Sequence, residues 1–205
     1  MRTGGSFVER ARRDQIVRAT IEVLAERGYA ASSFKQIAAH VEVSPALITY
    51  HFRTRDLLMR SVLETVEARL DAAMAGDGAE PDSYPGALRG MLERYVGHCS
   101  EHGDEISAMT EIRRHARGEG VRATVAGNHA GGTAELVAFV EEGQAHGQFR
   151  GTDPALFATV LMSAMGEVPR LLTGDRASDR ALAAEWAGLF VAALSATGEP
   201  TEEQG

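Results

Sequence analysis

The sequence predicts an all-α fold in two parts. Apolar residues recur at helical spacing along most of the 205 residues, and no segment alternates as a strand does. Two helix starts also lie unusually close together, at Ser33 and at Ser44. These observations predict a small three-helix domain over residues 9–56 and a larger helical domain over residues 57–197.

The first predicted helix runs from about Glu9 to Arg27. Gly28 follows it at the position where a left-handed residue commonly ends a helix. The residues before it, 1–8, have no periodicity and are expected to be a flexible leader. One face of the helix is apolar at helical spacing and is expected to be buried: Ile16, Ala19, Val23 and Leu24.

Two short helices and the start of a third follow. Ser33 is a good N-cap, and Gln36 three residues later completes the pattern of a capping box. Ser44 with Pro45 starts a second helix after a turn of about three residues, and Thr54 starts a third. Two helices this short share a core only when they cross steeply, which is the helix-turn-helix arrangement.

The second short helix is expected to present a free face. At about 100° per residue, placing Ile48 inward also turns Phe52 and Pro45 inward. The outward residues are then Ala46, Thr49 and Tyr50, with Leu47 on the flank. Such a face is narrow enough for a DNA major groove, which is about 12 Å wide.

The remaining chain is expected to form helices separated by Gly- and Pro-containing turns. The segment over 75–86 is the richest in Gly, Pro and Asp and is expected to be a loop. The predicted helices cover residues 54–75, 87–102, 104–116, 121–146, 153–172 and 178–196. The stripe expected to be buried on the first of them is Leu57, Leu58, Val62, Thr65 and Val66.

Charge is divided unevenly between the two parts. Residues 1–60 contain ten Arg or Lys and six Asp or Glu, a net charge of +4, whereas the rest contains 11 and 23, a net charge of −12. Because phosphate contacts need local positive charge, a basic end on an acidic body is compatible with DNA binding despite the overall charge of −8. The cluster Arg10, Arg12, Arg13 and Arg18 is either a phosphate-contacting or a solvated face.

The segment VSPALITYHFRTRDLL resembles the recognition-helix signature of the TetR-type (tetracycline-repressor-like) transcriptional regulators. The resemblance extends from about Arg13 to Leu58, and a weaker one covers VEEGQAHGQFRGTDPALFATVLMSAMGEVPRLL. Two positions differ: Glu42 replaces the usual turn glycine, and Thr49 replaces a usual Tyr, with the aromatic residue at Tyr50. The resemblance implies a sequence-specific DNA-binding regulator, expected to be a ligand-released repressor that binds a palindromic operator as a homodimer.

The resemblance also implies residues for each task. Lys35, Ala46, Leu47 and Thr49 are expected to reach bases or phosphates, and Ser33, Tyr50, His51 and Arg55 to position phosphates, with Ser44 and Pro45 at the same surface. An unknown small-molecule effector is expected in a helical cavity, with candidate lining residues Met91, Tyr95, His98, Met109, Ile112 and His115. Plain core packing is the alternative for each of them.

A dimer is also expected from the apolar stripes of the last two helices, which a domain this small does not bury completely. The predicted interface comprises Leu161, Ala164, Met165, Trp186, Leu189 and Phe190. Burial within one chain is the alternative.

Other classes of function have weaker signals. No G-x-S-x-G, P-loop or H-E-x-x-H motif is present, so neither an enzyme nor a cofactor is expected, although a helical enzyme or carrier stays an alternative. His98 and His102 at i, i+4 beside Cys99 raise the alternative of a metal-responsive regulator. The lone cysteine and the absence of a long apolar run predict a cytoplasmic protein without a membrane span.

Overall fold

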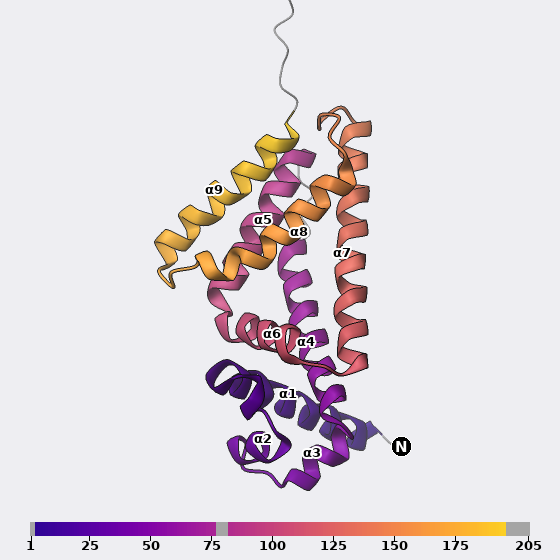
Figure 1. Cartoon of the computed structure of the whole chain (residues 1–205), viewed down its shortest axis with the longest axis vertical. Helices are drawn as coiled ribbons and strands as arrows, with labels where there is room; N and C mark the ends of the chain where they lie inside the picture. The colour runs from indigo at the N-terminus through magenta and orange to yellow at the C-terminus, as the bar shows by residue number, and fades with distance from the viewer. Residues whose placement is uncertain (1–2, 77–81, 196–205) are drawn as a thin grey trace, which may run out of the picture. The chain divides into compact units, whose positions relative to one another are not determined.

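The computed structural model of the chain describes residues 3–76 and 82–195, and in these ranges the fold is all-α, as predicted. Figure 1 shows the helices. Their bounds are α1 Thr3–Ala31, α2 Phe34–His40, α3 Pro45–His51, α4 Arg55–Ala75, α5 Tyr84–Glu101, α6 Gly103–His115, α7 Glu119–Ala145, α8 Pro154–Leu171 and α9 Arg176–Leu194. No helix in the described part of the chain combines the length and the apolar character that a bilayer crossing requires.

The described residues form two compact units that do not follow the predicted boundary at residue 56. Within the described ranges, one unit contains the chain up to residue 71 together with residues 102–128, and the other contains the residues between 72 and 101 and those from 129 onward. The helix-turn-helix is therefore packed together with α6, the first part of α4 and the start of α7. The functional boundary between residues 56 and 57 stays a prediction.

In the first unit, α1 supplies the main apolar face and lies against α6. The predicted face is confirmed, since Ile16, Val23 and Leu24 are fully buried and Ala19 nearly so. The predicted leader is wrong in part, because α1 already begins at Thr3. Gly28 interrupts the helix with φ 74° and ψ 175°, as its predicted role as a stop requires.

The stripe on α4 is shifted relative to the prediction. Leu58, Val62 and Val66 are buried as expected, but Leu57 is 40% exposed and Thr65 is only half-buried. The inward positions instead include Met59 and Leu63. The face was misplaced because residues 57 and 65 lie on the edge of the apolar stripe, where periodicity does not distinguish flank from centre.

A buried carboxylate ties three helices of the first unit together. Glu67 on α4 is 9% exposed and accepts a hydrogen bond from Arg113 Nη2 on α6 at 3.1 Å and another from Asn128 Nδ2 on α7. Burial raises the pKa of Glu67, while Arg113 opposes that shift. The polar contacts therefore compensate only part of the cost of burying this charge.

The start of α7 is held by Asp56, in the first turn of α4. Its Oδ1 accepts a hydrogen bond from the Val121 backbone N–H at 3.3 Å. Gly118 and Gly120 make room for the carboxylate, because a Cβ at either position would lie 1.6 Å or 2.4 Å from an Asp56 oxygen. The positive end of the α7 dipole also stabilises the negative charge of this carboxylate.

The second unit is built on α5, which packs mainly against α9 and also against α8. Buried Asp179 at the start of α9 accepts hydrogen bonds from the Thr173 N–H at 2.9 Å and from Ser100 Oγ on α5 at 2.7 Å. These two bonds, that from the Thr173 N–H foremost, hold the pKa of Asp179 below its usual value. The carboxylate thereby joins α5 to the turn between α8 and α9.

Arginine side chains cap two helix ends in the second unit. Arg94 on α5 donates to the Met74 carbonyl at the end of α4 through Nε at 3.0 Å and Nη2 at 2.6 Å. Arg150 Nε donates to the Ala193 carbonyl at the end of α9 at 2.7 Å. These three bonds satisfy two carbonyls that have no partner within their own helix.

Candidate nucleic-acid interface

Three hydroxyl caps set the ends of the helix-turn-helix, as predicted. Ser33 Oγ accepts from the Gln36 N–H at 3.3 Å, and Ser44 Oγ accepts from the Leu47 N–H at 3.2 Å. Thr54 Oγ1 accepts from the Leu57 N–H at 3.2 Å at the start of α4. Short helices depend on such caps, because each has few internal hydrogen bonds.

The turn between α2 and α3 contains a residue in the left-handed region. Glu42 has φ 54° and is the only described non-glycine residue with a positive φ. Its side chain is exposed. Glycine adopts this conformation without penalty, whereas the Cβ of Glu42 makes the backbone strained at this position.

The free face of α3 is confirmed. Ile48 and Phe52 are buried at 0% and 1%, whereas Tyr50 is 72% exposed and Ala46 and Thr49 are exposed as well. Leu47 is half-buried, as a flanking residue should be. Figure 1 shows α3 following α2 at one end of its unit, so the face is open to a large partner.

One residue of α3 departs from the predicted facing. Pro45 is exposed rather than turned inward. It is the first residue of α3, whose buried residue is Ile48 in the next turn. Pro45 is thus available at the outer surface, together with Ser44 and the exposed Ser33 and Lys35.

Arg55, a predicted phosphate contact, makes contacts within its own unit. Its guanidinium donates to the Tyr29 carbonyl and to Ser32 Oγ, the latter at 2.8 Å, and lies 3.9 Å from the centre of the Tyr29 ring. His51 is half-buried beside Tyr50, with the two rings edge to face at 5.1 Å. Nη2 of Arg55 is thus engaged within the unit, and its predicted contact with a phosphate stays a prediction.

The predicted effector-lining residues fall in both compact units. In the second unit, Tyr95 and His98 are buried, Met91 is half-buried, and the Tyr95 hydroxyl donates to the Met165 carbonyl at 2.7 Å. In the first unit, Met109 and Ile112 are buried. The effector cavity itself stays a prediction.

His115, the last of the predicted lining residues, lies at the surface of the first unit. Its side chain is 46% exposed, stacks on Tyr29 at 6.2 Å between ring centres, and lies 3.4 Å from the Glu111 carboxylate. At the last residue of α6, it faces the end of α1 rather than an enclosed apolar space. Periodicity alone gave no sign of this, since Tyr29 is distant in sequence.

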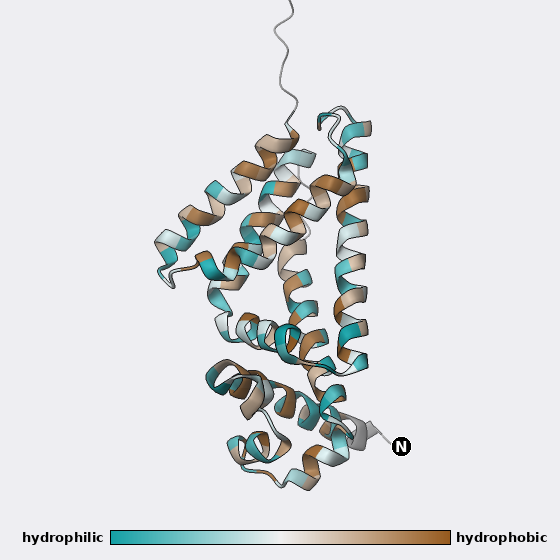
Figure 2. Cartoon of the chain, in the orientation of Figure 1, coloured by the Kyte–Doolittle hydropathy of each residue, from teal (hydrophilic) through white to brown (hydrophobic). Residues whose placement is uncertain are grey.

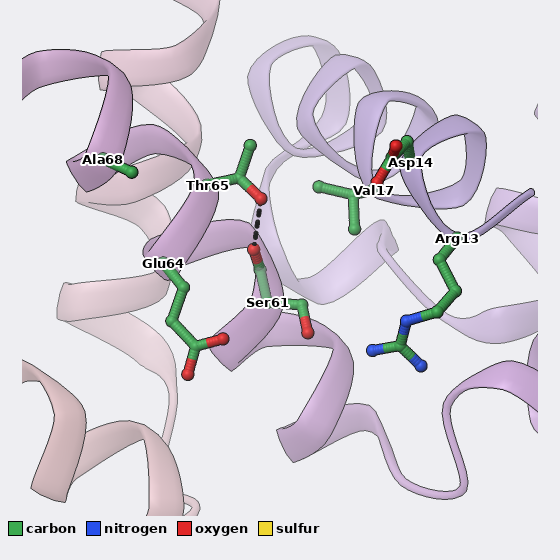
Figure 3. Close-up of a pocket in the computed structure, with 7 residues that line it drawn as sticks. All are labelled: Arg13, Asp14, Val17, Ser61, Glu64, Thr65 and Ala68. Atoms are coloured by element: carbon green, nitrogen blue, oxygen red, sulfur yellow. Dashed lines mark hydrogen bonds between the residues drawn. The ribbon is translucent and has the colours of Figure 1, made fainter. Parts of the chain in front are cut away.

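A surface groove lies between α1 and α4 of the first unit, with a volume of about 350 Å³. Figure 3 shows the side chains on its two walls. The lining residues are Arg13, Asp14 and Val17 on α1, and Ser61, Glu64, Thr65 and Ala68 on α4. Sequence reasoning did not find this groove, because the two walls belong to helices that are far apart in the chain.

The metal alternative finds no support in the described residues. Within them, no three His, Cys, Asp or Glu side chains are grouped so as to hold a metal ion. Cys99 is 2% exposed, and burial raises the pKa of its thiol to about 11. A neutral buried thiol is a poor metal ligand, because the thiolate is the form that binds.

The predicted dimer residues divide by exposure. Leu189 is 65% exposed, and Ala164, Met165 and Phe190 are half-buried. Leu161 and Trp186 are 0% and 7% exposed within their own chain, with Trp186 packed on Phe190 at 5.0 Å between ring centres, as the alternative of burial within one chain expects. The interface itself stays a prediction. The exposed large apolar residues of α8 that sequence reasoning did not place at the interface are Leu156, Val160 and Leu171.

These features define a capped helix-turn-helix whose second helix, α3, has a buried inner side and an exposed outer face. Residues 16–62 match the model of the bacterial regulatory proteins, tetR family. The HTH-type transcriptional repressor NicS of Pseudomonas putida is 27% identical over 145 residues, which cover 67% of this chain and 66% of the repressor. The chain thus spans just under two thirds of that relative's length. The helix-turn-helix segment is thus similar to that of the tetR family of bacterial regulatory proteins, and the relative NicS is a repressor of the helix-turn-helix type.

Solved structures share the fold. A putative TetR-family transcriptional regulator from Rhodococcus sp. aligns with a TM-score of 0.75 and 23% identity, over 88% of this chain and 99% of that chain. AibR in complex with isovaleryl coenzyme A and operator DNA aligns with a TM-score of 0.75 and 17% identity, over 87% and 97%. At these identities the likeness concerns the fold.

Proposed function

We propose that the protein is a transcriptional repressor that binds a palindromic operator as a homodimer and is released from it by a small-molecule effector. The observation that carries the proposal is the exposed, uncharged face of α3, which is built on a capped helix-turn-helix with a buried inner side. A face with Tyr50 72% exposed has no partner within its own unit. The size of one short helix suits the major groove.

The residues divide between reading and positioning. Ala46 and Leu47 offer methyl groups to thymine, and Thr49 offers a hydroxyl to a base edge. Ser33, Lys35, Ser44 and Tyr50 surround that face and suit phosphate oxygens. Lys35, the only lysine of the chain, brings a full charge to the start of α2.

Repression and effector release are proposed from the relatives. NicS is named as a repressor, and AibR was crystallised with isovaleryl coenzyme A and operator DNA. We infer the same order of events here: an effector between the helices of the larger domain displaces α4, which begins directly after the recognition helix, and thereby changes the spacing of the two recognition helices in a dimer. Such a protein acts on cytoplasmic DNA and is not an enzyme.

The dimer is proposed to form through α8 and α9. Exposed Leu156 and Val160 on α8 and Leu189 on α9 form the apolar surface that supports it. Figure 2 shows apolar residues recurring along both helices. Two half-sites about 34–36 Å apart are then expected in the operator, since each protomer contributes one recognition helix to the same side of the duplex.

The test begins with selection of binding sites from a random duplex library by the full chain. The expected result is a palindromic consensus sequence that two protomers bind. The substitution L189D, in the proposed dimer surface, should abolish this binding. A screen of metabolites by thermal shift then finds compounds that also release the selected duplex. Recovery of no preferred sequence at any salt concentration would refute the proposal.

A further inference from the structure

Arg13 holds the C-terminal end of the recognition helix. Its Nη1 donates to the carbonyl of His51, the last residue of α3, at 2.7 Å. The guanidinium carbon also lies 4.3 Å from the centre of the Phe52 ring. The carbonyl at a helix end has no intrahelical partner, and the negative end of the helix dipole attracts a cation. Arg13 therefore fixes α3 against α1 by a hydrogen bond and a ring contact together.

Arg55 holds the segment that leads into the first short helix. It bonds the Tyr29 carbonyl and Ser32 Oγ and lies over the Tyr29 ring at 3.9 Å. Ser32 is fully buried and directly precedes Ser33, the N-cap of α2. Arg55 is itself the first residue of α4. One side chain thus fastens the start of α4 to the turn between α1 and α2.

We propose that Arg13 and Arg55 are positioning residues that set the orientation of the helix-turn-helix, and that neither acts chiefly as a phosphate contact. The proposal rests on the proposed DNA-binding function. Both guanidinium groups combine a hydrogen bond to a carbonyl with contact to an aromatic ring, and a lysine ammonium does not reproduce that combination. Lysine does bind phosphate, so the two roles respond differently to an Arg to Lys change.

Positioning also has a distinct effect on selectivity. Base contacts require α3 at a defined depth and angle, whereas contacts to phosphates tolerate small shifts. Loss of either arginine should therefore weaken binding to the operator more than binding to unrelated DNA. A role only in overall stability would lower both affinities by the same factor, because it reduces the folded fraction.

The experiment measures the dissociation constants of the wild type, R13K, R13A, R55K and R55A for the selected operator and for an unrelated duplex over a series of salt concentrations. For both lysine variants we expect about a tenfold loss on the operator, the order of effect of one hydrogen bond to a charged group, and less than about a threefold loss on the unrelated duplex. The slope of log affinity against log salt should stay at the wild-type value. By comparison, K35A should lower that slope by about 0.9 if Lys35 neutralises one phosphate.

Matched controls are R180K and R180A, which change an exposed arginine on α9 outside the helix-turn-helix. Circular dichroism and melting curves establish the folded fraction of every variant at the assay temperature, and the lysine variants decide the outcome if an alanine variant is unfolded. Wild-type affinity in R13K and R55K, or a slope reduced by about 0.9 in the alanine variants, would overturn the proposal. Absence of any preferred duplex for the wild type is a different result, which refutes the proposed function instead.

Discussion

Replacement of Glu42 by glycine should stabilise the protein. A non-glycine residue in the left-handed region costs about 1–2 kcal/mol relative to the right-handed form, and Glu42 has φ 54°. Glycine removes this cost but adds freedom to the unfolded chain worth about 0.5–1 kcal/mol. The net expectation for E42G is a gain of about 0.5–1 kcal/mol in the free energy of unfolding.

The control for that change is E42A. Alanine removes the exposed carboxylate but keeps the Cβ, so the strain remains and the stability should stay within about 0.3 kcal/mol of the wild type. Both variants lose a negative charge next to the proposed DNA surface, so both should bind DNA more tightly by a similar factor. The pair therefore separates backbone strain, which glycine alone relieves, from charge, which both variants change.

The assay is urea unfolding followed by circular dichroism, with the slope of each transition compared between variants to exclude a change in the unfolded state. A stability of E42G equal to or below the wild-type value would refute the argument from strain. An equal gain in E42A would assign the effect to the carboxylate. Duplex affinity, measured on the same preparations, tests the charge argument separately.

Three further outcomes are expected. G143A should lower the free energy of unfolding by about 1–3 kcal/mol, because a Cβ at residue 143 would lie 2.2 Å from the Phe149 ring. In G131A, on the same helix, the added Cβ would have no atom within 4 Å, so this variant should raise the free energy of unfolding by about 0.5–1 kcal/mol. A loss of stability in both variants would contradict the packing argument. Because the pKa of Glu67 in the folded state is raised above 4.5, the stability of the wild type relative to E67Q should be greatest below about pH 4.5 and fall as the pH rises through the folded-state pKa. Urea unfolding measures this difference, and an increase of the relative stability over that range would contradict the argument. Operator DNA should protect Lys35 from an amine-reactive reagent more than unrelated DNA does. Mass spectrometry measures the labelling of Lys35, with the N-terminal amine as the reference. Equal labelling with and without operator would show that Lys35 is not part of the interface.

Local features of the fold were predictable because they depend on few neighbouring residues. The caps at Ser33, Ser44 and Thr54 and the stop at Gly28 follow from side-chain and backbone chemistry within four positions. The buried side of α3 followed from the helical period once Ile48 was placed inward. Length and period were sufficient for these inferences.

Contacts between distant segments were not predictable in the same way. Arg55 stands in the basic part of the chain, and only the structure reveals that its guanidinium lies over the Tyr29 ring and that Nη2 bonds the Tyr29 carbonyl. Trp186 had two possible environments, and its burial depends on the neighbouring helices of its own unit. A long side chain reaches several partners, so its sequence position does not determine which partner it takes.

The two buried carboxylates described above have opposite consequences for the response to acid. The pKa of Glu67 in the first unit is raised, so acidification favours the folded form at this residue. The pKa of Asp179 in the second unit is lowered, because the Thr173 N–H and Ser100 Oγ donate hydrogen bonds to its ionised form, so acidification removes that stabilisation. Of these two buried carboxylates, only Asp179 is therefore expected to weaken its unit as the pH falls.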